Sequence, residues 1–84
     1  MKCVFVQLRC QPGKTYEVAQ EVYLREIASE LYSTSGDFDL LAKIYVPEDQ
    51  DIGVYLNEGL LDIPGIVRSL TTITFKAIHT GGGV

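Results

Sequence analysis

The stretch STSGDFDLLAKIYVPEDQD, from Ser33 to Asp51, contains the signals that decide the fold. A strand-like segment ends in Ser-Gly-Asp, an alternating apolar segment follows, and a proline and several acids close it. Glycine first in a two-residue loop favours a type II′ hairpin, so Gly36 and Asp37 are predicted to form the turn. Pro47 ends the second strand, and the acids after it place negative charge at the positive end of a helix. The stretch therefore predicts strand, tight turn, strand and helix.

The flanking sequence extends this pattern in both directions. Residues 2–10 alternate with a period of two and predict a strand, which Pro12 and Gly13 end. A helix is predicted from Thr15 to about Ile27, and further strands at 30–35, 38–46 and 66–78. The inner stripe of the first helix is predicted to be Ala19, Val22, Tyr23 and Ile27. A second helix between Pro47 and Pro64 presents Ile52, Tyr55, Leu56, Leu60 and Ile63 on one side.

The resulting order, β-α-β-β-α-β, is typical of a ferredoxin-like α+β sandwich. Both helices are expected on one face of a four-stranded antiparallel sheet, with the first and third strands at its centre. The other face of the predicted sheet is also apolar, because it carries Cys3, Phe5, Leu41 and Tyr45. Contiguous apolar patches of this kind usually mark an interface, so we expect a homodimer that packs sheet against sheet. The alternative is that these are scattered apolar residues on a surface.

Length and charge limit the function classes. The chain has 84 residues and 9.3 kDa, which predicts a single domain over residues 1–79 and a flexible tail over 80–84. A net charge of −4 makes direct nucleic-acid binding a poor candidate. No apolar run approaches the roughly 20 residues of a membrane span, and no secretory signal is evident, so a cytoplasmic protein is expected.

Metal and disulfide chemistry find little support in the sequence. Cys3 and Cys10 are separated by seven residues of one predicted strand, about 23 Å, so they cannot pair within the chain. A single histidine, His79, supplies no cluster of ligands. Both cysteines are therefore interpreted as packing residues, and no metal or cofactor is expected.

Residues 35–76 resemble the effector-binding domain of the Lrp/AsnC (feast/famine) regulators. The resemblance rests on the order and spacing of several short motifs: Gly36-Asp37-Phe38-Asp39, Val46-Pro47, Tyr55-Leu56, Pro64-Gly65-Ile66, and Ser69, Thr71 and Ile73 in the last strand. It implies a dimeric α+β barrel, further assembly into rings that are often octameric, and amino-acid binding between dimers. Because the first residues already form the first strand, the chain looks like a stand-alone effector domain without a DNA-binding domain.

The resemblance places a ligand site at the Gly-Asp turn and the polar start of the last strand. The residues assigned to it are Gly36, Asp37, Phe38, Asp39, Ser69 and Thr71. The chemistry agrees, since Asp37 or Asp39 can accept hydrogen bonds from the ammonium group of an amino acid. Backbone N–H groups and the hydroxyls of Ser69 and Thr71 can donate to its carboxylate. The family commonly has tyrosine at Phe38 and threonine at Ser69. Each residue also has a structural interpretation, as turn geometry, local hydrogen bonding or strand composition.

We therefore expect a non-catalytic sensor of an amino acid or related metabolite, which associates with full-length Lrp/AsnC regulators. One alternative is a small dimeric α+β barrel enzyme, such as a cofactor-free monooxygenase. Such an enzyme needs a convergent His, Asn or Trp, and the chain has only His79, Asn57 and no tryptophan. The other alternative is a purely structural oligomerisation module.

Overall fold

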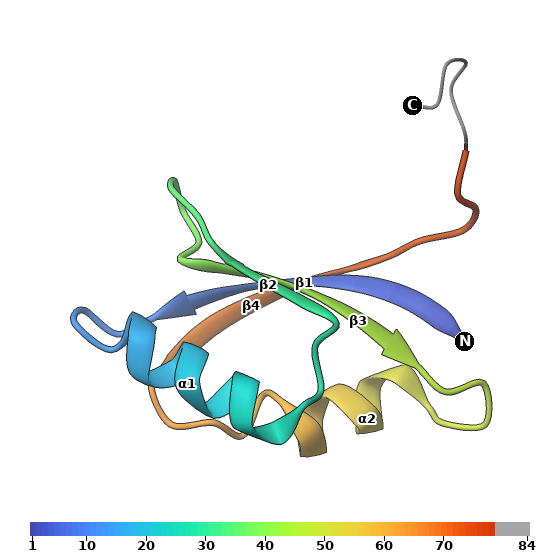
Figure 1. The fold of residues 1–84 in the computed structure, drawn as a ribbon, viewed down its shortest axis with the longest axis horizontal. Helices are drawn as coiled ribbons and strands as arrows, with labels where there is room; N and C mark the ends of the chain where they lie inside the picture. Colours follow the sequence, from blue (N-terminus) through green and yellow to red (C-terminus); the bar gives the residue numbers. More distant parts are fainter. Residues whose placement is uncertain (79–84) are drawn as a thin grey trace.

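The computed structural model describes residues 1–78, which form a four-stranded antiparallel sheet with two helices on one face (Figure 1). The elements are β1 (Lys2–Cys10), α1 (Thr15–Arg25), β2 (Glu30–Ser33), β3 (Leu40–Val46), α2 (Ile52–Gly59) and β4 (Ile66–Ile73). The strand order is β2-β3-β1-β4, so β1 and β3 are the central pair, as predicted. The predicted β-α-β-β-α-β order is confirmed. His79 and the predicted tail 80–84 lie outside the described residues.

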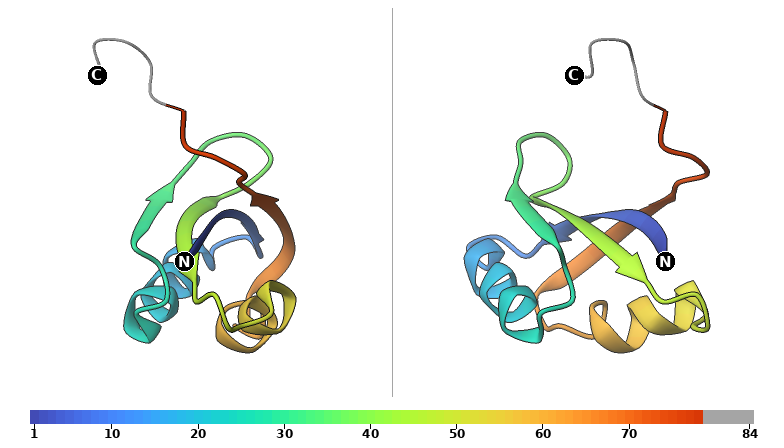
Figure 2. Two further views of the ribbon diagram at one scale, coloured as in Figure 1. Left: turned by 90° about the vertical axis from the view of Figure 1, so that its right-hand side faces the viewer. Right: turned by 45° about the vertical axis from the view of Figure 1, so that its right-hand side comes forward.

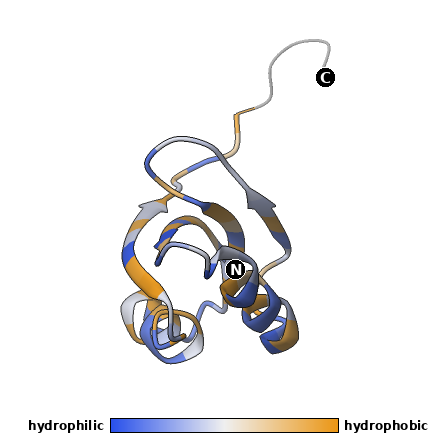
Figure 3. Ribbon diagram, turned by 90° about the vertical axis from the view of Figure 1, so that its left-hand side faces the viewer, coloured by the Kyte–Doolittle hydropathy of each residue, from blue (hydrophilic) through white to orange (hydrophobic). Residues whose placement is uncertain are grey.

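The core lies between the sheet and the helices. Residues paired directly across an antiparallel ladder share a face, and the pairs Val4–Ile44, Val6–Ala42 and Leu8–Leu40 all point toward the helices. Each of these side chains is essentially inaccessible to solvent. Figure 3 shows hydrophobic and hydrophilic residues alternating along the strands, as expected for a period of two. The predicted assignment of the two faces of β1 and β3 is therefore confirmed.

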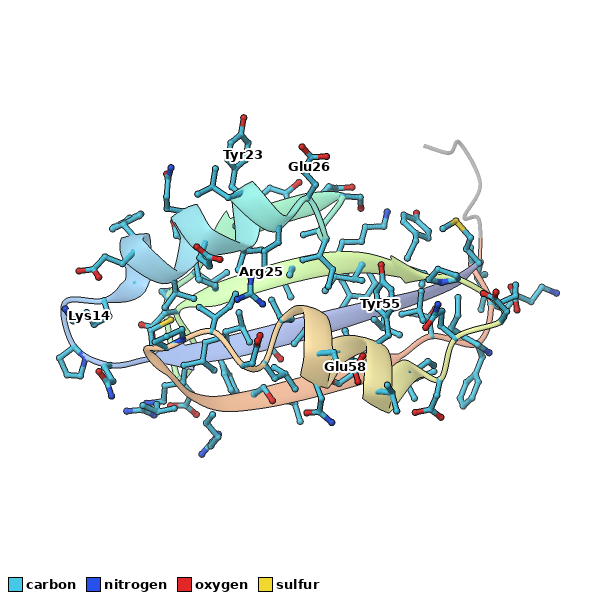
Figure 4. The ribbon with its side chains drawn as sticks, turned by 90° about the horizontal axis from the view of Figure 1, so that it is seen from below. Lys14, Tyr23, Arg25, Glu26, Tyr55 and Glu58 are labelled. Atoms are coloured by element: carbon cyan, nitrogen blue, oxygen red, sulfur yellow. The ribbon has the colours of Figure 1, made fainter. Side chains whose placement is uncertain are left out.

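The buried stripe of α1 differs from the prediction. Val18 and Val22, four residues apart, are the buried pair, whereas Tyr23 is 74% exposed. One residue beyond Val22 is a rotation of 100°, which carries Tyr23 off the buried face; Figure 4 shows its ring pointing away from α2. The helix also ends at Arg25 rather than near Ile27, because Glu26 adopts a left-handed φ of 55° and its N–H bonds to the carbonyl of Tyr23.

One residue of the acidic segment after β3 caps the N-terminus of α2. The Asp51 carboxylate accepts a hydrogen bond from the backbone N–H of Val54 at 3.0 Å, which makes Asp51 the N-cap. Buried Leu56, Leu60 and Ile63 pack onto the core, as the apolar pattern predicted. The helix itself ends at Gly59 rather than near Pro64, so Leu60 and Ile63 lie beyond it. At the other end, Arg25 of α1 donates to the carbonyl of Gly59 at 3.2 Å and so ties the two helices together (Figure 4).

The β2–β3 connection is longer than the predicted two-residue turn. The N–H of Thr34 bonds to the carbonyl of Asp39, and the Thr34 hydroxyl donates to the carbonyl of Phe38, both at 2.9 Å. Because Ser33 pairs with Leu40, residues 34–39 form the loop, which is called the hairpin loop below. The prediction of a type II′ turn at Gly36 and Asp37 is wrong. In addition, β3 begins at Leu40 rather than Phe38, and β4 ends at Ile73 rather than Ile78.

Candidate functional site

Two arginines lie side by side at the hairpin-loop end of the sheet. Arg9 of β1 is paired directly with Arg68 of β4. Both side chains are exposed and lie on the face opposite the helices, called the outer face below. The guanidinium carbon of Arg68 lies 5.0 Å from the centre of the Phe38 ring, and Arg9 Nη1 donates to the carbonyl of Asp37 at 3.5 Å. Like charges directly opposite on neighbouring strands are destabilising, so this pair is a natural position for an anion.

The Asp37 carboxylate supplies the opposite charge. Gly36 and Asp37 are both exposed in the hairpin loop, and Gly36 has a φ of 96° that favours glycine. Within residues 1–78, the Asp37 carboxylate has neither a hydrogen-bond donor nor an ion-pair partner. The hairpin loop that contacts both arginines through the Asp37 carbonyl and the Phe38 ring therefore also carries an acceptor without a partner.

Phe38 and Asp39 hold the hairpin loop in place. Phe38 is only 8% exposed, and Asp39 Oδ2 accepts a hydrogen bond from the backbone N–H of Cys10 at 2.8 Å. The pairing of β1 with β4 shifts register between Arg9 and Cys10, so Asp39 bonds to the backbone at this irregularity. Burial, followed by the nearby Asp39 charge, raises the pKa of the Cys10 thiol. These contacts give Asp39 a structural role.

Ser69 and Thr71 lie on the other face of the sheet. They pair with Leu8 and Val6, whose side chains point toward the helices, and both are half-buried. They share one face, as two strand residues separated by two positions must. Arg68, stacked on Phe38, lies on the outer face. A single protomer therefore gathers the hairpin-loop residues and the two arginines, but it does not bring Ser69 and Thr71 onto the same surface.

The sequence reasoning missed Arg9 and Arg68. Each belongs to a strand whose alternation places it on the outer face, but their juxtaposition depends on the register between β1 and β4. Together with Asp37, they present one negatively charged acceptor and two positively charged donors. A zwitterionic amino acid requires this combination, because its ammonium group needs an acceptor and its carboxylate is matched by guanidinium donors.

Much of the rest of the outer face is apolar, although Gln7, Lys43 and Thr72 also lie on it. Phe5 and Leu41 are half-buried in the protomer, whereas Tyr32, Tyr45 and Leu70 are exposed. Cys3, also on this face, is partly exposed. The two helices leave this side of the sheet uncovered, as both views in Figure 2 show. The predicted second apolar face is therefore present in the protomer.

The residues that an enzyme of this topology would need do not gather in the described part of the chain. Asn57 is exposed on α2, and His79 lies outside the described residues. No helix in residues 1–78 has the length and hydropathy that crossing a lipid bilayer requires.

The model of the Lrp/AsnC ligand binding domain matches residues 3–84, and the chain belongs to this family. It is 31% identical over 72 residues to the HTH-type transcriptional regulator FL11 of Pyrococcus abyssi, a match that covers 86% of this chain and 47% of the regulator. It is 26% identical over 68 residues to the regulator LrpA of the same organism, covering 81% of this chain and 48% of LrpA. The chain thus spans about half the length of the curated relatives it matches.

Solved structures show the same fold. TTHA0845 from Thermus thermophilus matches with a TM-score of 0.84 at 22% identity, covering 95% of this chain and all of that one. AsnC of E. coli matches with a TM-score of 0.82 at 14% identity, covering 90% of this chain and 52% of AsnC. The ferredoxin-like arrangement described above is the fold of these proteins.

Proposed function

We propose that this chain is a non-catalytic sensor that binds an amino acid, or a metabolite with the same two charged groups, at the hairpin-loop end of the outer face. The observation that carries the proposal is that Arg9 and Arg68 pair directly across β1 and β4 and contact the hairpin loop, which carries the exposed carboxylate of Asp37. The ligand carboxylate lies against the two guanidinium groups and relieves their repulsion, while its ammonium group donates to Asp37. A related fold supports the ligand class: the regulator NMB0573 of Neisseria meningitidis was solved as a complex with L-Met, and matches with a TM-score of 0.80 at 14% identity.

Association of copies is part of the proposal. The apolar outer face favours a dimer that packs sheet against sheet, and family resemblance favours further assembly into rings. Ser69 and Thr71 can then join the site only from a second copy, since their own protomer directs them to the opposite face. We propose that Gly36, Asp37 and Phe38 of one copy meet Ser69 and Thr71 of a copy in the neighbouring dimer of such a ring, because facing outer faces within one dimer keep Ser69 and Thr71 away from the partner's hairpin loop. Full-length Lrp/AsnC regulators present the same type of domain, so mixed assembly with them is the proposed route to transcription, and the cytoplasm is the expected compartment.

Thermal unfolding in the presence of each of the twenty amino acids, one at a time, tests the ligand. A ligand that binds only the folded state raises the melting temperature in a concentration-dependent way. At least one amino acid should do so with the unmodified protein, and Asp37→Asn and Arg68→Met should abolish the shift. Glu17→Gln, on the first turn of α1, is the matched charge control and should preserve it. If no amino acid shifts the transition, or if Asp37→Asn responds like the unmodified chain, the sensor proposal fails.

A further inference from the structure

The segment that follows β4 leaves the body of the protein on the side away from the helices. Residues 74–78, called the arm below, rise beyond the sheet near the start of β1, opposite the end where the hairpin loop rises (Figures 1 and 2). The arm begins at a fixed point, because both the N–H and the hydroxyl of Thr74 donate to the carbonyl of Cys3, at 3.3 and 2.7 Å. Its direction is therefore set by the sheet.

The arm carries a phenylalanine that nothing in its own protomer covers. Phe75 is 100% exposed. A phenylalanine buries roughly 150–250 Å² when it packs fully, so a large apolar surface of Phe75 is left without a contact in the protomer. A few residues of extended chain reach about 10–13 Å, and this arm starts on the outer side of the sheet. Phe75 thus cannot return to the core between the sheet and the helices.

A hollow of about 580 Å³ lies between the arm and the outer face. Its lining combines an apolar part, with Cys3, Phe5 and Tyr45 from the central strands and Phe75 from the arm, and a charged rim: Lys2, Lys43, Glu48 and Lys76. The same surface continues into Leu70 and Leu41 along the outer face. The outer face and the arm line this hollow, and a second sheet packed on the outer face would cover it.

We propose that Phe75 is an anchor between two copies of this chain: the arm of each copy folds over the outer face of the other, and Phe75 packs there. The inference rests on the proposed pairing of outer faces. It adds that the arm, rather than the flat sheet alone, supplies a large share of the association. In a dimer with a two-fold axis between the facing sheets, this contact occurs twice, so one substitution removes both anchors.

Sedimentation equilibrium over a dilution series tests the anchor. Phe75→Ser should raise the dimer dissociation constant at least about 100-fold, because each dimer loses two buried aromatic side chains. Phe75→Leu, which keeps an apolar side chain, should restore most of the affinity. Tyr23→Ser is the matched control, since it removes an exposed aromatic residue from the helix side and should leave the constant unchanged.

Folding is not expected to limit this experiment. Phe75 makes no buried contact in the protomer, so the far-ultraviolet circular dichroism of Phe75→Ser should match that of the unmodified chain. An unmodified protein that stays monomeric at every concentration would overturn both the pairing of outer faces and the anchor. A dimer whose dissociation constant is the same in Phe75→Ser would overturn the anchor alone and leave the pairing standing.

Discussion

The carboxylate of Asp39 bonds to the backbone N–H of Cys10 at 2.8 Å and so joins the hairpin loop to the end of β1 across 29 positions of sequence. The next backbone bond, from the N–H of Asp39 to the carbonyl of Leu8 at 2.8 Å, fixes the loop in the same place. Asp37, two residues earlier, has an exposed side chain. Two acids that look equivalent in the sequence thus have different roles: Asp39 holds the loop, and Asp37 exposes its side chain in the loop that contacts the two arginines.

Removal of the Asp39 carboxylate should therefore destabilise the fold. Asp39→Ala leaves the part-buried N–H of Cys10 without its acceptor and should lower the free energy of unfolding by about 1–3 kcal/mol. Asp37→Ala, at an exposed position, should change it by no more than about 0.5 kcal/mol. Urea unfolding of the two variants measures the difference. Equal losses would show that the Asp39 bond contributes nothing specific.

Arg9→Gln should separate stability from ligand binding. The substitution removes one of two like charges that face each other across β1 and β4, so the ligand-free protein should be as stable as the unmodified chain or up to about 1 kcal/mol more stable. The thermal shift produced by an amino acid should nevertheless disappear. Added sodium chloride, which screens the repulsion, should stabilise the unmodified chain more than Arg9→Gln. A ligand-free variant that is clearly less stable would contradict the assigned repulsion.

Gly65 tests the packing of the turn before β4. Its φ of 102° disfavours any residue with a side chain, and a Cβ there would lie 3.0 Å from Val18 Cγ2. Gly65→Ala should therefore lose about 2–3 kcal/mol of unfolding free energy. Gly36→Ala, with a φ of 96° and open space around it, has the backbone strain alone and should lose about 1–2 kcal/mol. Urea unfolding at neutral pH compares them, and a larger loss at Gly36 would refute the contact with Val18.

Glu30 should make stability depend on pH in the acid range. A hydrogen bond from the Tyr32 hydroxyl at 2.6 Å, and then the charge of Lys43, lower the pKa of Glu30 below its usual 4.5. The unfolded chain therefore binds the proton more readily, and this stabilisation is complete above pH 4.5 and is lost as the pH falls through the lower, folded-state pKa. Urea midpoints between pH 6 and pH 3 should fall less steeply in Glu30→Gln.

Two further variants rank the two causes of the lowered pKa of Glu30. Tyr32→Phe removes the larger contribution and should flatten the acid limb more than Lys43→Gln. Because the side chains are exposed, solvent screening keeps both effects small. If Lys43→Gln has the larger effect, the charge of Lys43 rather than the hydroxyl controls the carboxylate.

Local patterns in the sequence predict most of this fold. Alternation along β1 and β3 separates Val6 from Phe5 correctly, since burial on one face is a property of each strand by itself. Asp51 marks the start of α2 because capping depends on residues only three positions apart. The hairpin loop defeats this reasoning: the bonds of Thr34 to Phe38 and Asp39 close a longer loop, although Gly36 and Asp37 alone favour a shorter one.

The candidate site is less predictable because it depends on register between distant strands. Alternation shows that Ser69 and Thr71 share a face, but only the pairing of β4 with β1 shows that this face is the one toward the helices. The register shift between Arg9 and Cys10 likewise has no local signal. The same pairing places Arg68 beside Arg9, so the cationic half of the site emerges only when the sheet is assembled.

The alternation of β1 gives this chain two thiols with opposite surroundings. Cys10 is buried and has a raised pKa, so alkylation by iodoacetamide should wait for the fold to open. Cys3 is partly accessible at the root of the arm and should react readily until another molecule shields it. Mass spectrometry of the labelled chain can therefore follow unfolding and assembly separately, in one sample and with a single reagent.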